Sequence, residues 1–140
     1  MGEGEDSGIL KEAEIEENVF FDDSSDYFPS FKNSDACIQD CGSYLVEYLY
    51  TGKPCCYMLK EESDIDRKFS KLGQDCLEQC TIAYDTRTID AFIEDTVIKG
   101  NDEKKEGRLA FIKRIMVHYP HAAEAALEDI RETILKGDRK

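Results

Sequence analysis

The sequence lacks a long hydrophobic run. No segment of its 140 residues approaches the roughly 20 apolar residues that a membrane-spanning helix needs. It also lacks an export signal at its start, because residues 1–18 are acidic rather than basic and then apolar. These absences predict a cytoplasmic protein without a membrane span, whose first 18 residues form an acidic, flexible segment.

Basic residues are scarce. The chain has 18 Lys and Arg against 31 Asp and Glu, and its formal net charge is −13. A nucleic-acid partner needs a basic stripe for its phosphates, so the charge argues against that class of partner. An anionic nucleotide ligand would likewise depend on backbone N–H groups and local side chains rather than on the overall field of the protein.

Strand-like and helical patterns alternate along residues 19–140, which are long enough for one domain with a core. Short apolar runs predict strands at 19–21, 36–39, 55–59 and 81–84, and helical periodicity predicts helices at 44–49, 72–80, 86–99, 103–118 and 121–136. Such alternation predicts a parallel sheet with right-handed crossovers. We therefore expect an α/β fold. It would be a partial, Rossmann-like, three-layer domain of about four parallel strands, with the C-terminal helices packed on the sheet.

The segment 34–59 reads as strand, tight turn, helix, turn and strand. A helix that follows a parallel strand often holds phosphate, because its free N–H groups and the positive end of its dipole point at the ligand. Gly42 would let the backbone approach closely, and Ser43 would cap the helix or bind a phosphate oxygen. Glu47, one turn further along, would lie within reach of a ribose.

These residues also have purely structural explanations. Ser is a common helix cap and Gly a common turn former, and Glu47 is equally compatible with a solvated helix position. Asp40 would shape or cap the turn, since a carboxylate there would repel a donor phosphate. The polar segment 60–70 is compatible with a solvated surface loop or with a loop beside the donor site.

The same segment resembles the C-terminal half of a GT-B glycosyltransferase. It is most similar to the CDP-glycerol glycerophosphotransferase family, whose teichoic-acid polymerases carry the pattern SDaiItDySSfl.eyl.tgKPi. The family often has two serines where this chain has Gly42-Ser43, and the GT-B class places a Glu seven residues before a Pro, as Glu47 and Pro54 are placed here. The resemblance covers roughly residues 19–135. Its specific part consists of Ser34-Asp35, Asp40, Ser43, Glu47-Tyr48-Leu49 and Gly52-Lys53-Pro54.

The resemblance implies the donor-nucleotide-binding part of a transferase for cell-surface polymer synthesis, such as teichoic acid or capsular polysaccharide. The donor would be CDP-glycerol or a nucleotide sugar, without a cofactor or a metal, and its binding residues would be Asp40, Cys41, Gly42, Ser43 and Glu47. The family's N-terminal half and its upstream His-Pro element do not occur in this sequence. We therefore expect the missing half upstream or on a partner chain, no turnover by this chain alone, and peripheral membrane association of an intact enzyme. Catalytic residues stay unassigned.

Six cysteines keep other classes open. One alternative is a non-catalytic α/β interaction module, and another is a protein built on a metal site or on disulfides. Cys37 and Cys41, together with Cys76 and Cys80, offer thiols for zinc, although Cys-x-x-Cys is the usual spacing. We favour reduced, structural thiols, because free Cys inside a strand behaves as a small hydrophobic residue.

Overall fold

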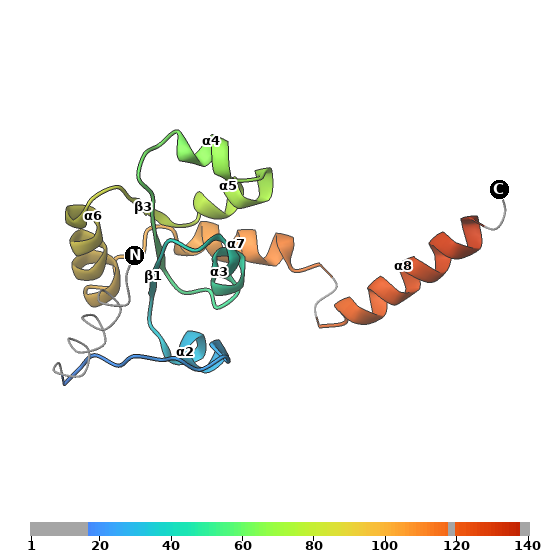
Figure 1. The fold of residues 1–140 in the computed structure, drawn as a ribbon, viewed down its shortest axis with the longest axis horizontal. Helices are drawn as coiled ribbons and strands as arrows, with labels where there is room; N and C mark the ends of the chain where they lie inside the picture. Colours follow the sequence, from blue (N-terminus) through green and yellow to red (C-terminus); the bar gives the residue numbers. More distant parts are fainter. Residues whose placement is uncertain (1–16, 118–119, 138–140) are drawn as a thin grey trace, which may run out of the picture. The chain divides into compact units, whose positions relative to one another are not determined.

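The computed structural model describes residues 17–117 and 120–137 (Figure 1). The chain divides into two compact units, residues 1–30 and 31–140, which we describe separately. The predicted acidic segment 1–18 lies outside the described residues except for its last two. The described elements are α2 Phe28–Asn33, β1 Cys37–Gln39, α3 Gly42–Leu49, β2 Cys55–Met58, α4 Asp64–Lys68, α5 Lys71–Leu77, β3 Thr81–Ala83, α6 Thr86–Ala91, the π-helix η1 Phe92–Ile98, α7 Lys105–Ile115 and α8 Ala122–Gly137.

The described part of the first unit is organised by Asp22 rather than by a strand. Its carboxylate accepts hydrogen bonds from the Ser24 backbone N–H (3.0 Å) and from the Ser30 hydroxyl (2.7 Å). The hydrogen bonds from Ser24 and then Ser30 lower the pKa of Asp22 to about 2. The strand that we expected at 19–21 is not found, and Phe20 is 88% exposed. A short apolar run forms a strand only where a neighbouring strand pairs with it.

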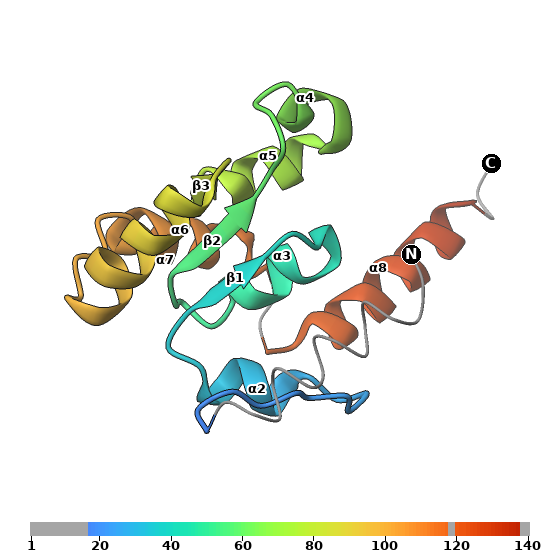
Figure 2. The same cartoon turned by 60° about the vertical axis from the view of Figure 1, so that its left-hand side comes forward.

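The second unit contains a three-stranded parallel sheet in the order β1-β2-β3, so β2 lies between β1 and β3 (Figure 2). Cys37 is in register with Cys55, and Cys56 is in register with Thr81. The predicted parallel and sequential arrangement of these three strands is confirmed. Helices connect them, as crossovers between parallel strands require.

One face of the sheet packs against α3, α5 and α7 (Figure 1). Leu45, Tyr48 and Leu49 of α3 are all buried, and their i, i+3, i+4 spacing places them on one side of that helix. The remaining buried members of this core are Cys55, Tyr57, Cys76, Leu77, Cys80 and Phe111. Short strands can hold the fold because several helices share this one core.

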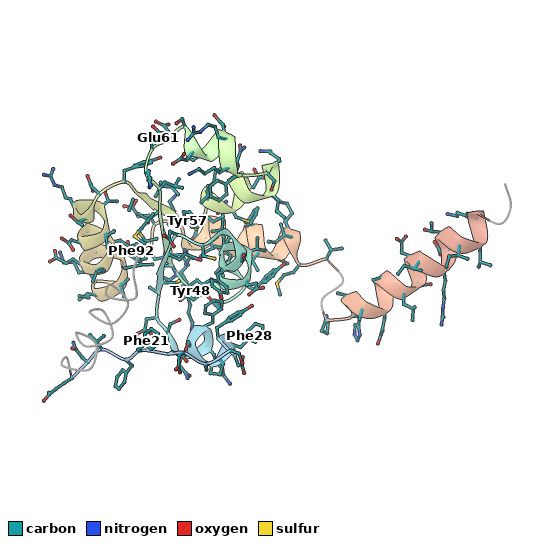
Figure 3. All side chains as sticks on the ribbon, viewed as in Figure 1. Phe21, Phe28, Tyr48, Tyr57, Glu61 and Phe92 are labelled. Carbon is teal, nitrogen blue, oxygen red and sulfur yellow. The ribbon has the colours of Figure 1, made fainter. Side chains whose placement is uncertain are left out.

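The opposite face packs against α6 and η1, so that Phe92 and Tyr57 lie on different sides of the sheet (Figure 3). The sequence predicted one regular helix over 86–99, whereas its second half is the π-helix η1. The Lys99 N–H donates to the Glu94 carbonyl, five residues earlier (3.1 Å). This wider winding places Phe92 and Val97, also five residues apart, against the same core of Cys56 and Ala83.

The two C-terminal helices differ in burial. Helix α7 buries Arg108, Phe111 and Ile112. In α8 every side chain from 122 to 136 is exposed except the half-buried Ala125. Our expectation that the C-terminal helices pack on the sheet therefore holds for α7 and is wrong for α8, because an amphipathic pattern identifies an apolar face but not what covers it.

Candidate functional site

Helix α3 begins at Gly42, directly after the carboxyl end of β1, as the sequence predicts. The N-cap is Cys41, whose backbone is extended and whose side chain makes no capping hydrogen bond. Ser43, which we expected as a possible cap, lies inside the first turn and is exposed. The Tyr44 N–H donates to the Cys41 carbonyl (3.2 Å). The Cys41 side chain caps none of the N–H groups that begin α3, and such N–H groups are what an anion site uses.

Four of the five predicted donor-binding residues lie at the start of α3, and the fifth, Glu47, lies in its second turn. Asp40, Cys41, Gly42 and Ser43 are consecutive at the β1–α3 turn. Glu47 follows Ser43 by four residues, which places the two side chains on the same side of the helix, about 6 Å apart along its axis. Glu47 is half-buried. The spacing suits a ligand that lies along α3 from its first turn to its second.

Several other residues of the motif serve the fold instead. The Ser34 hydroxyl is hydrogen-bonded to the Tyr48 hydroxyl (2.9 Å). The Lys53 ammonium donates to the carbonyls of Phe31 (2.9 Å) and Lys32 (2.7 Å) in the last turn of α2. Gly52, at φ +77°, has the left-handed conformation that follows the end of a helix. These contacts explain why the segment carries this part of the pattern.

Gly42 has no such role in the fold. Its backbone does not have a positive φ, and a Cβ atom added there would meet no heavy atom within 4 Å. A larger residue at Gly42 would therefore not strain the turn. The space in front of Gly42 is open, and a ligand is one reason for a glycine to stand there.

Carboxylates dominate the electrostatics at this edge of the sheet. Burial, followed by electrostatic interactions with Cys41 and Asp40, raises the pKa of the Tyr57 hydroxyl. Burial, followed by the negative charges of Glu62 and Asp64, raises the pKa of Tyr84, the residue after β3. A diphosphate at the start of α3 would therefore enter a negative field, and its binding would be weak.

The segment 60–70, expected as a loop, contains helix α4. Asp64 in its first turn is almost fully buried and pairs with Arg67 (2.6 Å) and Lys68 (3.4 Å). The hydrogen bond from Arg67 is the main cause of the lowered pKa of Asp64. Two of the three cations of this segment, Arg67 and Lys68, are therefore engaged by acidic side chains of the same segment.

The six cysteines are all free thiols. Among residues 17–117 and 120–137, no cluster of three or more His, Cys, Asp or Glu side chains is arranged to hold a metal ion. An interaction with Cys55 and burial raise the pKa of Cys37. An interaction with Cys37 lowers the pKa of Cys55, but interaction with Cys80 and burial outweigh it and raise that pKa to about 12. Thiols of this kind pack as apolar groups.

Sequence reasoning missed a cavity of about 460 Å³ at the amino ends of β2 and β3. Pro54, Thr81 and Phe92 contribute to its wall. Arg108 also lines it, donating from Nε to the Gly52 carbonyl (3.0 Å) and forming a two-pronged ion pair with Asp102. No sequence signal could have found the cavity, because its walls come from segments more than 50 residues apart.

Comparison with models of known protein families, with curated proteins and with solved structures found no match. In the described part of the chain, no helix has both the length and the apolar character needed to cross a membrane.

Proposed function

We propose that this chain is the donor-nucleotide-binding part of a glycosyl- or glycerophosphotransferase that builds a cell-surface polymer, such as teichoic acid or capsular polysaccharide. One observation carries the proposal. Asp40, Gly42 and Ser43 gather at the start of α3 without packing in the core, whereas the fold uses other residues of the same motif.

The chemistry of the proposed site follows from the helix start. The donor diphosphate would accept hydrogen bonds from the first N–H groups of α3 and from the Ser43 hydroxyl. Glu47 would accept hydrogen bonds from the ribose. Cys41 would contribute backbone rather than its thiol, and Asp40 would shape the turn. The donor would be CDP-glycerol or a nucleotide sugar, and no cofactor is needed.

In this proposal the three strands are the last part of a larger sheet in a Rossmann-like, three-layer domain. The donor would bind at the carboxyl ends of the strands, as ligands of open α/β sheets do. The acceptor and the base that activates it would come from an N-terminal half, on the same chain or on a partner. The protein would be cytoplasmic, and the complete enzyme would associate with the membrane surface.

The test is a titration of the ¹⁵N-labelled protein with CDP and with UDP, using cytidine as a comparator that lacks phosphate. We expect amide signals of residues 40–47 to shift first, with a Kd on the order of millimolar, because the other half of the cleft is absent and the field is unfavourable. Cytidine should shift them less. The proposal fails if millimolar nucleotide leaves residues 40–47 unchanged or shifts only segment 60–70.

A matched pair of variants separates direct contact from general electrostatics. Glu47→Ala and Glu62→Ala each remove one negative charge, and the smaller repulsion alone would tighten the binding of an anion in both. A direct contact between Glu47 and the ribose predicts that Glu47→Ala instead weakens binding by about threefold or more. Gly42→Val should weaken binding without loss of stability, since the space that it fills is the one that the phosphate needs.

A second candidate function is a non-catalytic α/β interaction module, and the exposed apolar residues of α8 favour it. A protein that fails the nucleotide titration but associates through α8 would have this function.

A further inference from the structure

Helix α8 exposes an apolar stripe. The stripe consists of Ala123, Leu127, Ile130 and Ile134, and its three large side chains are 51%, 55% and 59% exposed in that order. Their spacing of four, three and four residues is the spacing of the core positions of a coiled coil. The stripe therefore has the pattern of a helix that pairs with another helix along about 17 Å.

We propose that the occupant of this stripe is the α8 helix of a second copy of the chain, in antiparallel orientation. In that arrangement Leu127 packs against Ile130 of the second copy, and Ala123 packs against Ile134 of the second copy. At each end of the pair, a large Ile faces a small Ala, so a large and a small side chain share the volume of that layer. Each layer occurs twice, because the pairing is two-fold symmetric.

The charges beside the stripe select this orientation. Glu124 and Arg131 are seven residues apart, which is about two helical turns, so both lie on the same flank of α8, next to Ala123 and Ile130. In an antiparallel pair the same flanks of the two helices meet, and Glu124 of each copy faces Arg131 of the other. In a parallel pair this flank would instead meet Ala126 and Thr133, which carry no charge.

The expected association is weak. A contact between two 16-residue helices lies at or below the low end of stable interfaces, about 1,200 Å². Each copy also carries a formal charge of −13, which opposes self-association at low salt. We therefore expect a Kd on the order of tens of micromolar at about 0.15 M salt, where the Debye length is about 8 Å.

The experiment is sedimentation equilibrium of the full chain between about 5 and 500 μM, a range that brackets this Kd. We expect a reversible monomer–dimer equilibrium, and Leu127→Asp should abolish it while the circular dichroism spectrum keeps its helical signal. A chain that stays monomeric over the whole range overturns the proposal, as does a Leu127→Asp variant that still dimerises.

Charge variants test the orientation. Glu124→Arg and Arg131→Glu should each raise the Kd by about tenfold or more, because each converts two ion pairs per dimer into two repulsions. The double variant E124R/R131E should restore the Kd to within about threefold, since the pairs form again with their signs exchanged. Glu128→Arg is the control: it changes the net charge as Glu124→Arg does, but it lies off this flank and should leave the Kd within about threefold. Failure of the double variant to restore dimerisation overturns the antiparallel pairing.

Discussion

Replacement of Arg108 by Ala should be among the most destabilising single changes in this protein. Arg108 is 1% exposed, and its guanidinium joins the Gly52 carbonyl, which follows α3, to the Asp102 carboxylate in the connection before α7. The substitution leaves the Asp102 carboxylate without its partner, and water cannot fully replace that partner because the Asp102 side chain is only 15% exposed. It also leaves the Gly52 carbonyl without its donor.

The size of the effect follows from this burial. Breaking a buried ion pair from one side costs about 3–5 kcal/mol, because the remaining charge is desolvated and unpaired. The residual exposure of Asp102 admits some water, so we expect the lower end, about 3 kcal/mol. With a urea dependence of roughly 1.5 kcal/mol per molar for a domain of this size, the unfolding midpoint should fall by about 2 M.

Equilibrium urea unfolding, followed by circular dichroism, measures this loss. Lys113→Ala, an exposed change on the same helix, is the control and should cost less than about 0.5 kcal/mol. The double variant R108M/D102L replaces both charges by apolar groups and should lose only about 1 kcal/mol, because the Gly52 carbonyl alone keeps an unmet hydrogen bond. A loss below about 1 kcal/mol for Arg108→Ala, or equal losses for the single and double variants, would refute this account of the pair.

Three further predictions address the core, the turns and the thiols. Leu49→Ala, at a fully buried position, should cost about 3 kcal/mol in urea unfolding, whereas the exposed Leu135→Ala should cost less than about 0.5 kcal/mol; equal losses would contradict the core assignment. Gly52→Ala should cost about 1–2 kcal/mol in the same assay, because φ is +77° and a Cβ would lie 3.2 Å from a methyl group of Leu109. An unchanged unfolding midpoint would contradict the left-handed turn. The raised pKa of Cys37 and Cys55 keeps the thiolate scarce at pH 8, so these two residues of the native protein should react slowly with a thiol reagent. The denatured protein should yield all six thiols without reductant, and fewer than six would indicate a disulfide.

The sequence predicted the sheet of the second unit well for a physical reason. Segments such as 55–59 are apolar throughout and lie beside helices with a clear apolar side, so local pattern and tertiary burial agree. The turn at Gly52 was equally predictable, because a glycine just after a helix end commonly adopts the left-handed conformation. At this point one residue type and one local conformation determine each other.

Other features depend on contacts that no local pattern encodes. The apolar run at 19–21 has a strand-like composition, but pairing decides whether it becomes a strand. The π-helical winding of η1 arises from the fit of Phe92 and Val97 to the sheet, which a helical period of 3.6 residues does not anticipate. The Arg108–Gly52 hydrogen bond and the cavity beside it join segments distant in sequence. For the candidate site, the sequence located the turn, but it could not tell that Gly42 is dispensable for the fold or that Lys53 is engaged with α2.

The short edge strands of the sheet limit its ability to pair with the sheet of another copy of the protein. In the order β1-β2-β3 both outer strands are edges, and each is three residues long. A three-residue edge spans only about 10 Å and offers an incoming chain very few backbone hydrogen bonds. α3 begins three residues after the end of β1, and the Asp85-capped α6 begins three residues after the end of β3, so neither edge can lengthen much at its carboxyl end unless a helix unwinds. The brevity of these strands thus protects the folded protein against edge-to-edge polymerisation without the lysines or prolines that long edge strands use.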